Sequence, residues 1–186
     1  MVMNTPFSGY GQANEGMTGN FTRECYDVQY AHGILHLGKK TCVMGILNVT
    51  PDSFYDGKRY DIPVDAVEQG LNMVKNGASI IDIGGESTRP GAFPVSEAEE
   101  IERVIPVIKL LSKRIRTPIS IDTYKAKVAE MAIDAGASMI NDVGGLCVDK
   151  KMAQVAAGSR VPVIKKKKKG NPRTMQKYPI RKDACV

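Results

Sequence analysis

Short apolar runs alternate with longer amphipathic stretches along the chain from residue 42 onward. The runs predict buried strands, and the stretches, with apolar residues three and four positions apart, predict helices. Strands are predicted at 42–49, 78–84, 118–123, 138–143 and 161–164. Helices are predicted between them, at 64–77, 96–115, 124–136 and 149–158. This alternation predicts a parallel sheet with both faces covered.

Local signals refine this picture at three places. Ser96 followed by Glu99 is a capping-box pattern that predicts the start of the second helix. Residues 27–38 predict a β-hairpin centred on Gly33, which we expect to plug the bottom of a barrel. Residues 1–24 are rich in Gly, Asn, Thr and Ser and predict a disordered tail.

Two architectures fit alternating strands and helices: a doubly wound open sheet and a (β/α)₈ barrel of the TIM type. Polar residues or glycines stand at the ends of the first four strands, where the active sites of such barrels are built; they are Asn48, Asp82 with Gly84 and Gly85, Asp122, and Asn141. No GxGxxG follows the first strand, so a dinucleotide-binding fold loses its main support. We therefore expect an α/β fold of the TIM-barrel type, incomplete here with about five of the eight βα units, preceded by the short β-hairpin.

Composition and charge exclude several classes of protein. The chain has no apolar run long enough for a membrane span and no secretory signal pattern, so we expect a cytoplasmic protein without membrane contact. The four cysteines lack the spacing of a metal or redox site. The net charge of +6 comes from the segment after Ile164, which carries the lysine run 165–169. Because no aromatic residues interleave with these lysines, we do not expect nucleic-acid binding.

Two loops after the first two strands have the composition of functional loops. Residues 48–57 combine an amide, hydroxyls, carboxylates and aromatic rings, which is more than a structural turn needs. Residues 84–91 combine glycines, hydroxyls and Arg89, a set that suits a phosphate group. The alternative for the second loop is a polar turn with a solvated arginine.

Asp122 and Asn141–Asp142 place carboxylate and amide groups at the ends of the third and fourth strands. Such groups can recognise a heterocycle that presents both hydrogen-bond donors and acceptors. Either could instead cap the following helix, and of the last two residues Asp142 is the better candidate for a cap. Base catalysis by histidine is not expected, since His32 and His36 lie upstream in the hairpin.

Four segments together resemble one known family. Residues 44–57 (MGILNVTPDSFYDG) and 77–90 (GASIIDIGGESTRP) closely resemble the first and second signatures of dihydropteroate synthase. Residues 120–123 (SIDT) and 140–143 (INDV) match the same family in order and spacing. The resemblance implies that residues 25–186 form a partial pterin-binding barrel domain.

The resemblance also implies an activity, that of a transferase of folate biosynthesis. The family joins 6-hydroxymethyl-7,8-dihydropterin diphosphate to 4-aminobenzoate and gives 7,8-dihydropteroate and diphosphate. By analogy Asn48 would help to hold Mg²⁺ and the diphosphate, and Thr88 and Arg89 would contact the leaving group. Asp122 and Asn141 would bind the pterin ring.

Further implications concern the 4-aminobenzoate site, where Ser53, Phe54 and Asp56 lie on the loop that would close over it. Asp56 and Arg89 would be the catalytic residues, sulfonamides would compete with 4-aminobenzoate, and the full-length protein would be a homodimer. The sequence departs from the family pattern at 165–168, where lysines replace a more apolar segment, and it ends before the last three barrel strands. We therefore expect little activity from this chain; the alternative is a non-catalytic fragment that binds pterin or phosphate.

Overall fold

The structure is a computed structural model that describes residues 2–3, 24–50, 62–87 and 94–165. All the strands and helices predicted downstream of residue 41 are confirmed, with ends that differ by up to four residues. None of the helices in these ranges is long and apolar enough to cross a membrane.

The main sheet contains five parallel strands in the order in which they occur along the chain. They are β4 (Cys42–Asn48), β5 (Ile80–Gly84), β6 (Ile119–Asp122), β7 (Met139–Asp142) and β8 (Val163–Lys165). A doubly wound sheet reverses its strand order at one point, whereas a barrel adds each new strand beside the previous one. The unbroken sequential order therefore favours the barrel over the open sheet.

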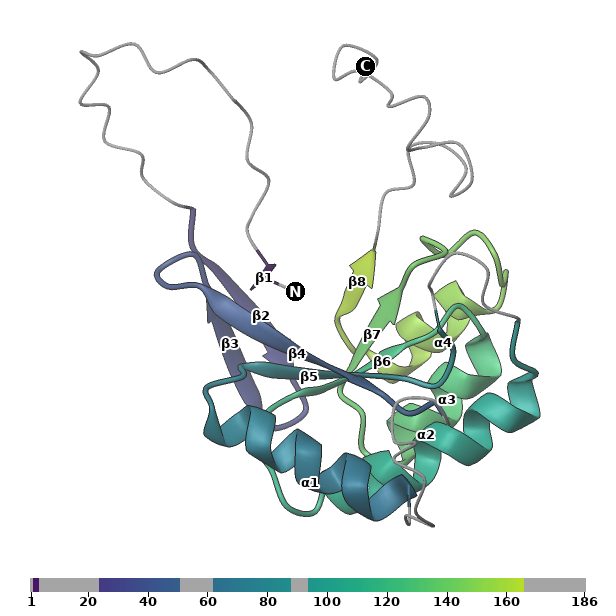
Figure 1. The fold of residues 1–186 in the computed structure, drawn as a ribbon. Helices are drawn as coiled ribbons and strands as arrows, with labels where there is room; N and C mark the ends of the chain where they lie inside the picture. Colours follow the sequence, from purple (N-terminus) through teal and green to yellow (C-terminus); the bar gives the residue numbers. More distant parts are fainter. Residues whose placement is uncertain (1, 4–23, 51–61, 88–93, 166–186) are drawn as a thin grey trace, which may run out of the picture.

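Four helices connect these strands: α1 (Ile62–Lys75), α2 (Glu97–Leu111), α3 (Ala126–Asp134) and α4 (Met152–Ser159). Consecutive helices pack against one another, and Figure 1 shows them together on one side of the sheet. The predicted parallel sheet is confirmed; the four helices cover its outer face, and in a barrel the second face is the interior. The predicted start of the second helix is confirmed, since Ser96 is its N-cap and Oγ of Ser96 accepts a hydrogen bond from the backbone N–H of Glu99 at 3.2 Å. The carboxylate of Glu99 pairs with Arg103.

The two faces of the sheet differ in character because neighbouring residues of a strand point to opposite sides. Leu47, Ile83, Ile121 and Ile140 point toward the helices and are fully buried in the main hydrophobic core. The next residue of each strand lies on the opposite, inner face; these residues are Asn48, Gly84, Asp122 and Asn141. The polar strand ends therefore lie on the side of the sheet opposite α1, α2, α3 and α4.

An antiparallel hairpin precedes the sheet, formed by β2 (Tyr26–Tyr30) and β3 (Gly33–Leu37). Its turn is at residues 31–32, so Gly33 begins β3 instead of occupying the centre of the turn. Val28 and Leu35 of the hairpin pack on an inner cluster of Met44, Ile80 and Met139. Ile80 and Met139 are the first residues of their strands, so the hairpin covers the amino ends, as the expectation of a plug requires.

One further strand, β1 (Val2–Met3), pairs antiparallel with β4 opposite Val43 and Cys42. These two residues fall within the segment 1–24, for which the disordered tail stays a prediction. Residues 1 and 4–23 lie outside the described part of the chain.

Candidate functional site

The carboxyl ends of four strands bring polar groups into one row. In the register of the sheet Asn48 lies beside Gly84, Gly84 beside Asp122, and Asp122 beside Asn141. Neighbours in register share a face, so these four residues form a continuous strip on the inner face, which we call the strand-end layer. Residues that are tens of positions apart in the sequence thus lie on adjacent strands, which are about 4.8 Å apart.

A buried hydrogen bond connects this layer to the row beneath it. Nδ2 of Asn141 donates to Oδ2 of Asp82 at 2.8 Å, across β6, which lies between their strands. Both side chains are buried, with 1% of Asn141 and 2% of Asp82 exposed. Because a carboxylate only accepts hydrogen bonds, this contact fixes the orientation of the amide and leaves Oδ1 of Asn141 available as an acceptor.

Oδ1 of Asn141 and Oγ of Ser120 are buried oxygens on the inner face that have no hydrogen-bond partner within the described part of the chain. Ser120 lies beside Asp82 in the register and is fully buried. Buried polar atoms in folded proteins are nearly always hydrogen-bonded to protein or water. The arrangement can therefore bind a polar group that offers a donor to Asn141, or a water molecule that connects these oxygens.

Adjacent glycines shape this end of the sheet in different ways. A Cβ on Gly84 would lie 3.6 Å from Cβ of Asp122 and 3.8 Å from Oδ1 of Asn48, so the glycine leaves an open gap between the two side chains. A Cβ on Gly85 would lie 2.9 Å from Val104 and 3.0 Å from Glu100, both on α2. Gly84 keeps the layer open, and Gly85 lets α2 pack closely on the sheet.

A cluster of charges joins the two connections beside the layer; we call Glu86, Glu100, Tyr124 and Lys125 the Lys125 cluster. Nζ of Lys125 forms ion pairs with Glu100 and, at 2.5 Å, with Glu86. The hydroxyl of Tyr124 donates to Glu86 at 3.1 Å. Sequence reasoning missed this cluster, because the residues that bond to one another are 25 to 39 positions apart. Only Glu86 stands in a segment that the sequence singles out.

The environment shifts the protonation of two members of this cluster. Burial lowers the pKa of Lys125, but hydrogen bonds and charges from Glu100 and Glu86 outweigh it, so the net pKa is raised. Burial raises the pKa of Tyr124, and Glu86 adds to the effect while Lys125 opposes it. Lys125 therefore stays protonated and Tyr124 stays neutral at physiological pH.

The connection after β7 is held by two carboxylates of different function. Asp142 accepts hydrogen bonds from the backbone N–H groups of Gly144 at 2.6 Å and Leu146 at 2.7 Å. It stabilises its own loop, and the expectation that it caps the next helix is wrong, since α4 begins only at Met152. Asp149 instead caps the preceding helix, accepting from Ala126 at the start of α3 at 2.9 Å.

The structure brings together three of the residues that the sequence selects: Asn48, Asp122 and Asn141. The others lie outside the described residues, so their positions stay predictions; they are Ser53, Phe54, Asp56, Thr88 and Arg89.

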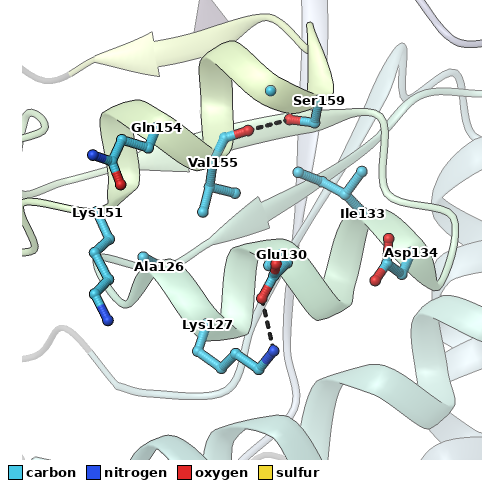
Figure 2. A pocket seen from close by; sticks show the side chains of 10 residues that line it. Ala126, Lys127, Glu130, Ile133, Asp134, Lys151, Gln154, Val155 and Ser159 are labelled. Atoms are coloured by element: carbon cyan, nitrogen blue, oxygen red, sulfur yellow. Dashed lines mark hydrogen bonds and ion pairs between the residues drawn. The ribbon is translucent and has the colours of Figure 1, made fainter.

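A concave region lies on the outer surface between α3 and α4 (Figure 2), with a volume of about 640 Å³. This volume is in the range of small-molecule pockets. The side chains of the region therefore have to show whether it is a better candidate site than the strand-end layer. Lys127 and Glu130 pair with each other at 2.7 Å and are half exposed. Lys127 and Glu130 thus satisfy each other in contact with solvent. On the inner face, Asp82 and Asn141 are buried and bonded to each other, which makes the strand-end layer the stronger candidate.

Comparison with known proteins identifies the family of the chain. The model of the family described as pterin binding enzyme matches residues 44–186. The dihydropteroate synthase of Bacillus subtilis is 60% identical over 126 residues, which are 68% of this chain and 44% of that protein.

Solved structures give the same result. The dihydropteroate synthase of Xanthomonas albilineans with 4-aminobenzoic acid superposes with a TM-score of 0.67 at 49% identity, over 70% of this chain and 47% of that one. The Yersinia pestis enzyme in complex with a sulfonamide drug gives 0.74 at 42% identity, over 85% and 57%. The chain thus spans about half the length of the proteins it matches, and its fold is that part of a TIM barrel. It belongs to the family of pterin binding enzymes.

Proposed function

We propose that the chain is the pterin-binding portion of a dihydropteroate synthase and that its strand-end layer binds the pterin ring. The observation that carries the proposal is the row of Asn48, Gly84, Asp122 and Asn141, with Asn141 held by a buried carboxylate. The side chains of this row can hydrogen-bond to the edge of a flat ring.

The chemistry of the ring fits these groups. One edge of a pterin carries an amino group and a ring N–H, both donors, and a carbonyl oxygen, an acceptor. Asp122 is partly exposed at the mouth of the sheet and supplies a carboxylate that can accept two such hydrogen bonds. Oδ1 of Asn141 is a further acceptor, and leaving it unpaired would cost about 1–3 kcal/mol. A ligand without donors would leave Oδ1 of Asn141 unsatisfied, so the site favours a donor-rich edge.

The reaction that we propose replaces one bond of the pterin methylene group. The C–O bond to diphosphate breaks, a C–N bond to the amine of 4-aminobenzoate forms, and the amine loses a proton. Thr88 and Arg89 are proposed to neutralise the leaving diphosphate, because charge-assisted contacts stabilise the negative charge that develops. Ser53, Phe54 and Asp56 are proposed to form the 4-aminobenzoate side, with Asp56 and Arg89 in catalytic contact with the reactants.

Mg²⁺ is the proposed cofactor, and the donors at the strand ends suit it. Mg²⁺ prefers oxygen ligands and often takes one or two protein groups, with substrate phosphates and water completing its shell. Oδ1 of Asn48 lies at the mouth of the layer, next to the gap at Gly84. Within the described ranges no three His, Cys, Asp or Glu side chains are grouped to hold a metal by themselves, which accords with an ion shared with the substrate. When bound, Mg²⁺ would neutralise charge on the diphosphate.

The remaining parts of the proposal concern the protein as a whole. Sulfonamides are proposed to compete with 4-aminobenzoate, and the complete protein is proposed to form a homodimer in the cytoplasm. Three cysteines in the described part of the chain are free thiols, which suits a reducing compartment. We also propose that these 186 residues turn over slowly on their own, because lysines replace the family's more apolar segment at 165–168.

Two measurements test the proposal separately. Isothermal titration calorimetry with 6-hydroxymethyl-7,8-dihydropterin diphosphate should show binding, and Asp122→Ala should weaken it by at least tenfold, about 1.4 kcal/mol. Asp134→Ala, which removes an exposed carboxylate on the outer side of α3, is the matched control and should bind like the wild type.

Turnover is followed as formation of 7,8-dihydropteroate after 4-aminobenzoate and Mg²⁺ are added. Binding with little turnover is the expected result for this chain. Absence of pterin binding, or equal binding by Asp122→Ala, would contradict the assignment of the strand-end layer.

A further inference from the structure

The Lys125 cluster lies beside the candidate site and has no part in the proposed chemistry. It connects three elements: Glu86 follows β5, Glu100 belongs to α2, and Lys125 lies between β6 and α3. Lys125 is mostly buried, with 13% of its side chain exposed, and Glu100 is 1% exposed. Ion pairs at this depth cost desolvation, so they are weak as devices for stability alone.

The cluster also lies on the backbone that carries the strand-end layer. Glu86 is two residues beyond Gly84, and Lys125 is three residues beyond Asp122. Tyr124 and Lys125 both hold the carboxylate of Glu86, so its two oxygens are bound from the neighbouring connection. Arg103 of α2 adds a hydrogen bond to the backbone oxygen of Gly85 at 2.7 Å.

Short backbone contacts continue this link into the layer itself. The N–H of Thr123 donates to the carbonyl of Asn141 at 3.2 Å, and the N–H of Lys125 donates to Oγ1 of Thr123 at 3.2 Å. The N–H of Val49 donates to the carbonyl of Gly84 at 2.8 Å. A displacement of Glu86 relative to Lys125 would therefore change the spacing between Gly84 and Asp122.

We propose that Lys125 is a positioning residue: through Glu86 and Glu100 it fixes the ends of β5 and β6 at the separation that the ligand of the strand-end layer requires. The ligand named in the test rests on the proposed function. A lysine suits this role because its charged ammonium group has three N–H donors and bonds to both carboxylates at once. Arginine can take the same role, since its guanidinium also donates to two carboxylates.

The test compares three variants of the full chain. Lys125→Met removes the link, Lys125→Arg keeps it, and Lys127→Met is the matched control, because Lys127 pairs with a glutamate on the exposed side of α3. Binding of 6-hydroxymethylpterin is measured by calorimetry well below the unfolding midpoint of each variant. Lys125→Met should bind at least tenfold more weakly, while Lys125→Arg and Lys127→Met should stay within about twofold of the wild type.

Hydrogen exchange supplies a readout that needs no ligand. In Lys125→Met the amides of Val49 and Thr123 should exchange at least tenfold faster, whereas the amide of Ile81, bonded to Pro118 in the centre of the sheet, should not change. Where Lys125→Met does not fold, Glu86→Gln replaces it and is expected to shift both readouts in the same direction.

The outcomes separate the two proposals. If the wild type binds no pterin but exchange at Val49 and Thr123 accelerates, the proposed function fails and the positioning role stands. If the wild type binds pterin and Lys125→Met binds it equally well, the positioning role is overturned. Equal loss of binding in Lys125→Arg would also overturn it, because the charge link would then not be what matters.

Discussion

Alanine substitutions at the two neighbouring glycines, Gly84 and Gly85, should have opposite consequences. Neither glycine has a positive φ, so an alanine fits the backbone at both positions. Gly→Ala at a compatible position stabilises by about 0.4–1 kcal/mol, because it restricts the unfolded chain. What differs between the two sites is the space that the new Cβ would enter.

At Gly85 the new Cβ would overlap α2. It would lie 2.9 Å from Cγ1 of Val104, 3.0 Å from Cγ of Glu100 and 3.3 Å from the backbone oxygen of Glu100. Overpacking of this kind costs about 1–3 kcal/mol, and the backbone oxygen cannot turn away as a side chain can. After the gain from the unfolded state, a net loss of about 1–2 kcal/mol is expected.

At Gly84 the nearest atoms are at 3.6 Å or more, which is ordinary contact. Gly84→Ala should therefore be as stable as the wild type or slightly more so. Its methyl group would, however, fill the gap between Asn48 and Asp122 on the inner face. If a flat ring occupies that gap, the substitution should weaken pterin binding by at least tenfold, about 1.4 kcal/mol.

Urea unfolding and calorimetry of both variants distinguish these effects. The midpoint of Gly85→Ala should fall by roughly 1 M, given a slope of about 1–3 kcal/mol per molar urea, while that of Gly84→Ala should not fall. Binding by Gly84→Ala should be lost while its stability is kept. The reverse pattern, a stable Gly85→Ala or a Gly84→Ala that binds pterin normally, would refute the assignment of the two faces.

Three further variants test single contacts by urea unfolding. Asn141→Asp should place a second carboxylate beside Asp82, so that the folded protein holds a proton that the unfolded chain releases near pH 4. The stability of the variant relative to the wild type should therefore fall as the pH rises from about 4 toward 8. Stability curves of the two proteins that stay parallel over this range would contradict this. Hydrogen bonds from the backbone of Ala126 and Lys151 lower the pKa of Asp149, so its contribution to the free energy of unfolding is present above the unfolded pKa and lost as the pH falls. Asp149→Ala should cost about 1 kcal/mol at neutral pH and approach the wild type in stability below about pH 3.9. A difference that stays constant with pH would argue against a role of the carboxylate charge. Ser96→Ala should lower stability by about 1 kcal/mol and Ser96→Asp should restore it, because either oxygen can accept from Glu99; equal stability of all three proteins would show that the cap contributes nothing.

The sequence was sufficient for features that depend on periodicity or on neighbours in the chain. Apolar runs located the strands, and Ser96 with Glu99 located the start of α2. The row of polar strand ends was also predictable, because parallel strands in sequential order bring their carboxyl ends to the same edge. For this reason Asn48, Asp122 and Asn141 could be selected before their distances were known.

Features that depend on side-chain contacts between distant segments were not predictable in this way. The bond between Asn141 and Asp82 crosses an intervening strand, and residue types alone do not say which polar group pairs with which. Asp142 and Asp149 illustrate the same difficulty, since the sequence favoured Asp142 as a cap, whereas in the fold Asp149 is the residue that reaches α3. The Lys125 cluster also needed the folded geometry, which joins three separate elements.

The central claim, that a pterin binds at the strand-end layer, is tested most directly by titrating ¹⁵N-labelled chain with 6-hydroxymethylpterin and following the backbone amides by NMR. The chemical shifts of the Gly84, Asp122 and Asn141 amides should change together along one saturable curve. Those of Glu130 and Gln154, which line the outer groove between α3 and α4, should not change. Shifts confined to the outer groove, or no saturable shift at the three strand ends, would contradict the account.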